Sequence, residues 1–115
     1  MNQSESYKSF ISELVETAPE GWEKILLKFE YYPWKGSNIE KYQCFCFISN
    51  LKSQFHPSLE ALDELILIHK LLTDANPEPW THCEFELLST GAYNFDFKYG
   101  IPPLTKIMLE TSGEI

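Results

Sequence analysis

The stretch NPEPWTHCEFELLSTGAYNFDFKYG, residues 76–100, is the most informative part of this chain. Apolar and polar residues alternate on both sides of residues 89–92, which contain a glycine. This period-two spacing around a turn predicts an antiparallel β-hairpin that is buried on one face. The buried face is expected to carry Cys83, Phe85, Leu87, Tyr93, Phe95, Phe97 and Tyr99. The opposite face is then polar and mostly acidic, with His82, Glu84, Glu86, Asn94, Asp96 and Lys98.

Upstream of the hairpin, the spacing of apolar residues predicts two amphipathic helices and two more strands. Apolar residues recur at helical spacing before Pro19, and again between Ser58, which can cap a helix, and Asn76-Pro77, which stop one. Between the helices, period-two alternation favours strands. The predicted elements are a helix over residues 7–18, a strand over 22–32, a loop over 33–38, a strand over 41–49 and a helix over 58–75.

The order helix, two strands, helix, two strands predicts the fold class. We expect a single α+β domain over residues 1–115, with an antiparallel four-stranded sheet and helices packed mainly on one face. A chain of this length buries about 65% of its unfolded surface and needs no disulfide or metal to fold. The strand over residues 41–49 is apolar on both sides, so we expect it to be central.

The sheet face that the helices leave uncovered is the expected binding surface. Aromatic anchors inside a charged rim are typical of protein-binding surfaces. We expect Trp34, in the predicted loop, to be a second contact, or else to pack under its own loop. In an alternative that stays open, the first helix or the C-terminal segment covers this face and makes it ordinary core. The apolar residues expected on the face are Trp22, Leu26, Tyr42, Cys44 and Trp80.

Charge separates this chain from nucleic-acid-binding proteins. Seventeen acidic residues oppose nine basic ones, all of them lysines, and the net charge is −8. A chain without arginine lacks the bidentate fork that grips phosphates, and its negative field repels nucleic acid. Acidity fits either a basic protein partner, such as a nuclease, or simple solubility. We therefore expect no direct binding of nucleic acid.

The sequence also bears on the cellular compartment. Residues 1–10 lack the basic segment and apolar core of a signal peptide. No apolar run approaches the ~18 residues that a membrane span needs. The three cysteines have no framework spacing, which fits a reducing compartment. We expect a cytoplasmic protein that does not contact a membrane.

Metal binding and nucleophilic catalysis have little support in the sequence. Cys44 and Cys46 share one face of a strand and His82 could approach them, but a structural zinc site needs four ligands. Cysteines also behave as small apolar residues inside sheets. Cys83 and His82 are adjacent on a strand and point to opposite faces, which disfavours a nucleophile and base pair. We expect no metal and no cofactor.

The carboxylates Glu84, Glu86 and Asp96 could lie close together across the hairpin. Paired carboxylates serve glycoside hydrolases, but those enzymes need a deep cleft, which a sheet this small rarely forms. A solvated acidic sheet face is the commoner result of such a pattern. The sequence contains no glycine-rich phosphate loop, serine elbow or helical His-Glu motif. We expect no catalytic residue and no enzymatic activity.

Three short motifs carry a family resemblance. Pro19-Glu20-Gly21-Trp22 opens the first strand, Glu78-Pro79-Trp80-Thr81 opens the third, and Thr90-Gly91, Asp96 and Tyr99 lie in the hairpin. Their order and spacing resemble those of the YezG-like immunity proteins, small bacterial antitoxins that neutralise secreted polymorphic toxins. The resemblance covers roughly residues 10–100. Members of the family often continue into a longer C-terminal helical tail, whereas this sequence stops at Ile115.

The resemblance implies an immunity protein that binds and neutralises a cognate polymorphic or contact-dependent toxin. We expect the toxin to be a nuclease that is inhibited by masking of its basic surface. A non-enzymatic adaptor or homodimer that uses the same face is the alternative, and a small hydrolase is a third class. A homo-oligomer is possible but not required. The expected partner-binding residues are Trp80 as anchor, Glu84, Glu86, Asp96, Glu78, Trp34 and Tyr42.

Overall fold

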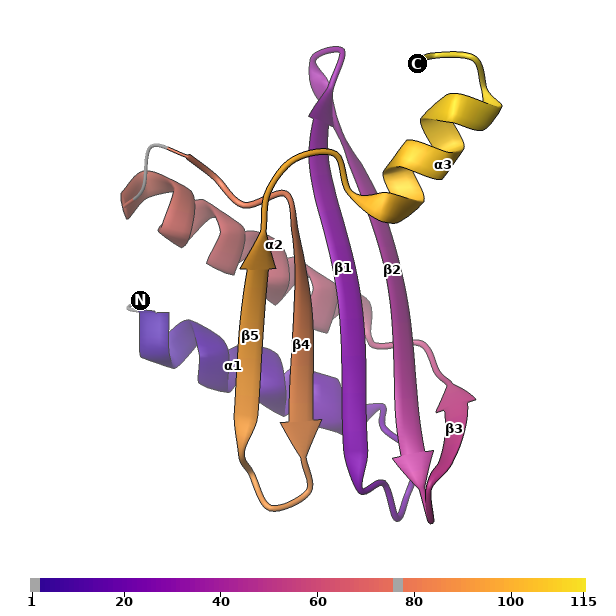
Figure 1. The fold of residues 1–115 in the computed structure, drawn as a ribbon. Helices are drawn as coiled ribbons and strands as arrows, with labels where there is room; N and C mark the ends of the chain where they lie inside the picture. The colour runs from indigo at the N-terminus through magenta and orange to yellow at the C-terminus, as the bar shows by residue number, and fades with distance from the viewer. Residues whose placement is uncertain (1–2, 76–77) are drawn as a thin grey trace.

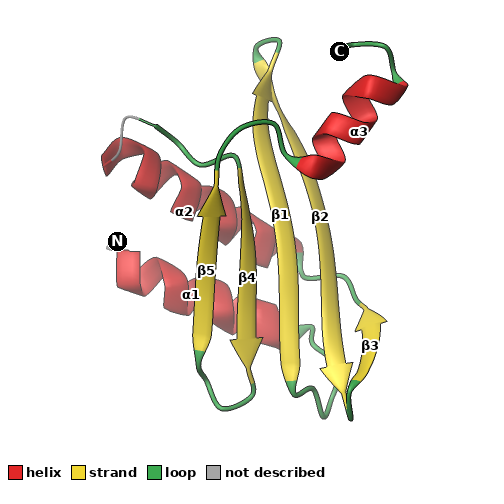
Figure 2. Cartoon of the chain, in the orientation of Figure 1, coloured by secondary structure: helices red, strands yellow, loops and turns green. Residues whose placement is uncertain are grey.

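The computed structural model describes residues 3–75 and 78–115. They form an α+β fold in which two long helices lie on one side of a five-stranded antiparallel sheet and a short helix lies on the other (Figure 1). The elements are α1 (Gln3–Glu16), β1 (Lys24–Trp34), β2 (Ser37–Ile48), β3 (Leu51–Gln54), α2 (Leu59–Ala75), β4 (His82–Leu88), β5 (Tyr93–Lys98) and α3 (Pro103–Thr111). Figure 2 distinguishes the helices, strands and loops by colour. The α+β class is confirmed, and the sheet has five strands where four are predicted.

Strand β1 is the middle of the sheet, whose strand order is β3-β2-β1-β4-β5. It pairs with β2 from Lys24↔Phe47 to Trp34↔Ser37, and with β4 from Lys24↔Leu88 to Glu30↔His82. Strand β2, expected to be central, is interior only where the four-residue β3 pairs with it. Because side chains alternate along every strand, these registers decide which residues share a face.

Two-residue turns join β1 to β2 and β2 to β3. Lys35 and Gly36 have φ values of 51° and 80°, and Ser49 and Asn50 have values of 50° and 66°. Two consecutive residues with positive φ are typical of the type I′ turn, whose twist matches that of the flanking strands. The predicted loop over residues 33–38 is therefore wrong, because all of it except Lys35 and Gly36 is paired in β1 and β2.

The side of the sheet toward α1 and α2, here called the helix face, carries the core. Its fully buried residues on β1, β2 and β4 are Ile25, Leu27, Phe29, Cys44, Cys46, Cys83, Phe85 and Leu87. Phe10 of α1 packs edge-on against Phe85, with ring centroids 4.9 Å apart. Leu65 and Ile68 of α2 belong to the same cluster. The predicted buried face of β4 is confirmed.

Strand β5 lies at the edge of the sheet, so its aromatic residues are less buried than predicted. Phe95 and Phe97 are half-buried against the core, while Tyr93 and Tyr99 are 46% and 48% exposed. The opposite side of the sheet is here called the open face, and it carries Lys24, Leu26, Lys28, Glu30, Tyr32, Trp34, Ser37, Ile39, Lys41, Gln43, Phe45, Phe47, Lys52, Gln54, His82, Glu84, Glu86, Leu88, Asn94, Asp96 and Lys98.

Helix α3 lies against the part of the open face near the β1–β2 turn (Figure 1). The expectation of helices mainly on one face therefore holds for α1 and α2 but not for α3. The C-terminal segment covers part of the open face, as in the alternative that the sequence leaves open. The predicted stop of α2 at Asn76-Pro77 lies outside the described residues.

Replacing Phe85 by Ala is expected to lower the free energy of unfolding by about 3–5 kcal/mol, because its ring is fully buried between Phe10 and Phe95. Phe95→Ala should cost less because this residue is half-buried at the sheet edge. Tyr93→Ala is the exposed control. Urea denaturation followed by circular dichroism gives the three values. A Phe85→Ala protein as stable as the parent would contradict the assigned core.

Candidate functional site

Glu30 is a buried carboxylate on the open face, and it holds α3 against the sheet. The residue is 4% exposed. Its Oε1 accepts hydrogen bonds from the backbone N–H and the hydroxyl of Thr105, both at 2.7 Å, and its Oε2 accepts one from the N–H of Leu104 at 2.8 Å. The first N–H groups of a helix have no partner within the helix, and a carboxylate there also meets the positive end of the helix dipole. Glu30 therefore serves as the cap of α3.

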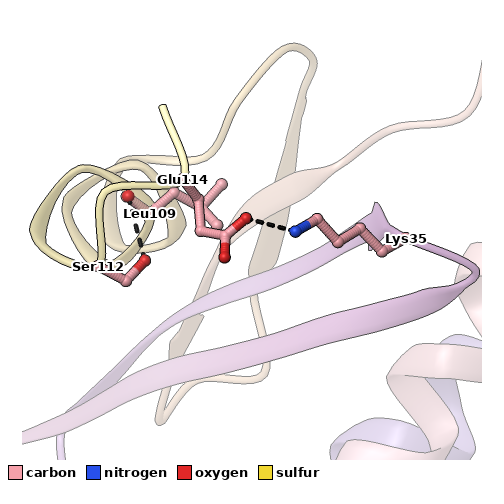
Figure 3. A network of polar contacts seen from close by, with 4 residues as sticks. All are labelled: Lys35, Leu109, Ser112 and Glu114. Atoms are coloured by element: carbon pink, nitrogen blue, oxygen red, sulfur yellow. Dashed lines mark hydrogen bonds and ion pairs between the residues drawn. The ribbon is translucent and has the colours of Figure 1, made fainter.

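The other end of α3 is tied to the β1–β2 turn. Lys35 Nζ donates a hydrogen bond of 2.6 Å to Glu114 Oε2 (Figure 3). The hydroxyl of Ser112 donates to the carbonyl oxygen of Leu109 at 3.2 Å and closes the last turn. Leu109 itself is 1% exposed. The first turn of α3 is thus held by Glu30 and its last turn by the buried Leu109, while the exposed Lys35–Glu114 pair adds little stability.

The open face as a whole carries mixed charge rather than an acidic surface. The expectation of an acidic face holds for the β4–β5 hairpin alone, because β1, β2 and β3 contribute most of the lysines that balance it. Five of the nine lysines of the chain face four carboxylates there: Lys24, Lys28, Lys41, Lys52 and Lys98 against Glu30, Glu84, Glu86 and Asp96.

The acidic trio, Glu84, Glu86 and Asp96, is brought together by the pairing of β4 with β5, as predicted. Glu84 lies directly opposite Asp96. Lys98 Nζ is 3.5 Å from Glu84 Oε1 and 3.8 Å from Asp96 Oδ2, and Lys24 Nζ is 3.7 Å from Glu86 Oε2. The side chains of Glu84, Glu86 and Asp96 stay 42%, 45% and 58% exposed. Ion pairs this exposed add little stability, so the carboxylates can exchange partners.

The net negative charge resides mainly on the two long helices. Helices α1 and α2 contain seven carboxylates and two lysines, a net of −5 out of the −8 of the chain. The carboxylates are Glu5, Glu13, Glu16, Glu60, Asp63, Glu64 and Asp74. The long-range negative potential is therefore concentrated on the side of the molecule that faces away from the open face.

The predicted anchor Trp80 is buried on the helix side. It is 2% exposed, and its ring centroid lies 5.2 Å from that of Phe97 and 4.8 Å from that of His69. His69 Nε2 donates to the carbonyl oxygen of Trp80 at 2.8 Å, and burial lowers the pKa of His69, which favours the neutral ring. The expected presentation of Trp80 at an exposed edge is wrong. Pro77, expected to fix its backbone, lies outside the described residues.

The side chains of strand β2 lie on the reverse faces of the sheet from those expected. Tyr42 pairs with Phe29 in the register and so points to the helix face, as does Cys44. Trp22 also packs against the helix-side core. Both alternating sets of β2 are apolar, so periodicity alone could not decide which set faces the helices. The apolar residues that the register places on the open face are instead Leu26, Tyr32, Trp34, Ile39, Phe45, Phe47 and Leu88.

Lysine side chains lie over the two phenylalanines of the open face. Lys52 Nζ is 4.1 Å from the ring centroid of Phe45, and Lys24 Nζ is 5.2 Å from that of Phe47. Such cation–π contacts combine an aromatic surface with positive charge. This end of the open face is therefore basic and aromatic, in contrast to the acidic β4–β5 end.

Trp34 and Glu78, the remaining predicted contacts, are reachable from solvent. Trp34 ends β1 opposite Ser37, is half-buried, and stacks on Tyr32 with ring centroids 6.4 Å apart. Glu78 is exposed, two residues before the buried Trp80. Their contact with a partner stays a prediction.

The cysteines lie on the helix face, away from His82. Cys44, Cys46 and Cys83 are free and buried, and burial raises the pKa of the Cys44 and Cys83 thiols to about 12, which makes them poor nucleophiles. His82 lies on the open face, so it cannot join Cys44 and Cys46 as a third ligand. Burial lowers the pKa of His82 against the opposing effect of Glu30. Among residues 3–75 and 78–115, no three His, Cys, Asp or Glu side chains are placed to hold a metal ion.

Glu30 and α3 are the parts of this surface that lie outside the sequence-based prediction. A weak signal for α3 exists, because Pro103 at the first helical position precedes apolar residues at Leu104 and Met108, four residues apart. Nothing in the sequence pattern distinguishes Glu30 from the other polar residues of an alternating strand.

The structure is a small α+β domain with a mixed-charge sheet face flanked by a short helix. A family model described as immunity protein YezG-like matches residues 3–105, from the start of α1 into the first turn of α3. The chain therefore belongs to the YezG-like immunity protein family, as its motifs suggest. Immunity proteins of this family bind a cognate toxin and are generally not enzymes. A search of curated proteins found no match.

Among the described residues, no helix is both long enough and apolar enough to cross a bilayer.

Replacing Glu30 by Ala is expected to lower the free energy of unfolding by about 1.5–3 kcal/mol, because buried N–H groups of α3 lose a charged acceptor. Thr105→Val removes only the hydroxyl and should cost about 1 kcal/mol. Urea denaturation measures both, and amide hydrogen exchange over residues 104–111 reports on α3 directly. Unchanged protection of these amides in Glu30→Ala would show that α3 does not depend on this cap.

Proposed function

We propose that this chain is the immunity protein of a secreted polymorphic or contact-dependent toxin, and that it neutralises the toxin by forming a stoichiometric complex with it. The observation that carries the proposal is the family match over residues 3–105. The cytoplasm is the proposed site of action, and the three free, buried cysteines suit its reducing conditions.

The proposed toxin is a nuclease, and the proposed mechanism is masking of its basic surface. A nuclease needs positive charge to hold a polyanion, and the net charge of −8 complements such a surface. Because most of the excess negative charge lies on α1 and α2, these helices supply much of the long-range attraction. The contacts at short range can then lie on a different face.

The proposed contact surface is the β4–β5 end of the open face, with the acidic trio at its centre. Cations of the toxin would replace Lys98 and Lys24 as partners of the trio. Glu78 and Trp34 are proposed as outlying contacts. Trp80 is left out of this contact surface because it is buried on the helix side.

The triple substitution Glu84→Lys, Glu86→Lys and Asp96→Lys is expected to weaken toxin binding by about 100-fold or more, because charge pairs closed off at an interface are costly to break. The probe is the toxin domain encoded beside this chain, and calorimetry gives the dissociation constant. The matched control, Glu16→Lys, Asp63→Lys and Asp74→Lys, changes net charge equally on the helices. Tight binding by the first variant, with a native circular dichroism spectrum, would place the interface elsewhere.

Association with the toxin is expected to slow as salt rises, because the Debye length falls from about 10 Å at 0.1 M to about 3 Å at 1 M. The helix control variant should bind more slowly than the parent at low salt and equally fast at 1 M, with an unchanged dissociation rate. Stopped-flow mixing measures both rates. An association rate that is flat across this range would contradict electrostatic steering.

Co-purification distinguishes this function from the alternative of an adaptor or homodimer. A one-to-one complex with the toxin domain supports the proposal. A dimer that forms with rising concentration and ignores the toxin domain would favour the alternative.

A further inference from the structure

Strand β2 has an unpaired outer edge over much of its length. It runs from Ser37 to Ile48, whereas β3 pairs only with the last four residues, from Phe45 onward (Figure 1). Within residues 3–75 and 78–115, no strand pairs with the outer edge of residues 37–43. Exposed edges of this kind are templates for the addition of another strand, and proteins commonly cover or interrupt them.

The backbone groups that point outward from this edge can be identified. The N–H of Phe55 donates to the carbonyl oxygen of Cys44 at 3.0 Å, on the outer side of β2. In an antiparallel strand, every second residue directs both its N–H and its C=O to the same edge. Asn38, Glu40 and Tyr42 therefore direct theirs outward. The two-residue turn agrees, because Trp34 and Ser37 beside it form a hydrogen-bonded pair, so odd-numbered residues of β2 bond to β1.

A groove borders this free edge. Its volume is about 570 Å³, and it is lined by residues 40–43 of β2 on one side and by Leu104, Ile107 and Met108 of α3 on the other. Ile107 is 62% exposed, the most exposed isoleucine of the described chain. Because Glu30 and the buried Leu109 fix α3 against the sheet, the groove is already formed in the free protein.

We propose that residues 38–42 of β2 form a docking edge that takes up an extended segment of the cognate toxin as a sixth strand, with α3 as the apolar wall of the groove. The inference rests on the proposed function and adds a second contact region to it. An extended peptide is the occupant that matches the edge, because only a strand offers hydrogen-bond partners for both the N–H and the C=O groups of alternate residues. The added strand would continue the line of β3 along β2.

Charge and polarity define the segment further. Lys41 lies on the open face, so the residue opposite it fits best if it is acidic. Glu40 lies on the other face, and a basic residue fits opposite it. Side chains that point toward Ile107 and Met108 are expected to be apolar. The segment is therefore a short strand whose charges are the reverse of Glu40-Lys41.

A second copy of this chain fits the edge less well. For two copies to pair, residues whose backbone N–H and C=O point outward in one copy must lie opposite such residues in the other. Two-fold registers centred on residues 40 and 41 place Glu40 opposite Glu40 and Lys41 opposite Lys41, whereas one centred on residue 39 faces Ile39 with Ile39, so charge disfavours two of these three registers. Like charges directly opposite each other are destabilising.

The test compares the affinities of Glu40→Pro and Glu40→Ala for the toxin domain encoded beside this chain. Both variants lose the carboxylate, but only proline also loses the outward N–H and blocks the approach of a strand. Proline is tolerated at an edge whose N–H faces solvent, so the free protein should keep its fold, which circular dichroism checks. We expect Glu40→Pro to bind about tenfold more weakly than Glu40→Ala.

A second pair of variants tests the wall of the groove. Ile107→Lys should weaken binding, whereas Ile101→Lys, the same change at an exposed isoleucine outside the groove lining, should not. Hydrogen exchange by NMR adds a readout at the edge itself. The amides of Glu40 and Tyr42 should exchange fast in the free protein and at least about tenfold more slowly in the complex. Those of Ile39 and Lys41 should be protected in both.

The possible outcomes distinguish a failure of the proposed docking edge from a failure of the proposed immunity function. If the parent binds the toxin domain but Glu40→Pro binds as tightly as Glu40→Ala, or the amides of Glu40 and Tyr42 stay unprotected, the docking edge is wrong and the immunity function stands. If these amides are already protected in a toxin-free dimer, the occupant is a second copy and the inference fails. If the parent does not bind the toxin domain, both the proposed function and the docking edge fail.

Discussion

The pairing of β1 on both of its edges is the constraint on which the rest of the structure depends. Because β1 bonds to β2 and to β4 at once, its alternation sets the faces of both neighbours. A slip of one residue would exchange Leu27 and Phe29 in the core for Lys28 and Glu30. The register that buries the first pair also brings Glu30 to the open face, where α3 requires an acceptor for its first N–H groups.

Because Glu30 caps α3 and holds it against the sheet, the open face is divided into distinct regions. Helix α3 covers the part of the open face near the β1–β2 turn and leaves the acidic β4–β5 end exposed. It also stands beside the free edge of β2 and forms one side of a groove there. A buried carboxylate needs its hydrogen bonds to offset the loss of water, so the position of α3 and the burial of Glu30 depend on each other.

The separation of charge between the two layers suits a protein that must find a partner quickly and hold it specifically. In the proposed complex, the acidic helices act at long range, where only net charge matters, whereas the sheet contributes contacts of both signs at short range. In β-strand addition, main-chain bonds supply affinity and side chains supply specificity.

The sequence by itself determined the α+β class, the β4–β5 hairpin with its clustered carboxylates, the acidity of the chain and, through its motifs, the family. These properties are local, because alternation, turn residues and composition are read within a short stretch. Only the tertiary structure decided which face of β2 meets the helices, that Trp80 is buried, that Glu30 caps α3 and that an edge of β2 stays free. Period-two spacing shows that alternate residues share a face, but which face is covered depends on helices that dock from distant parts of the chain.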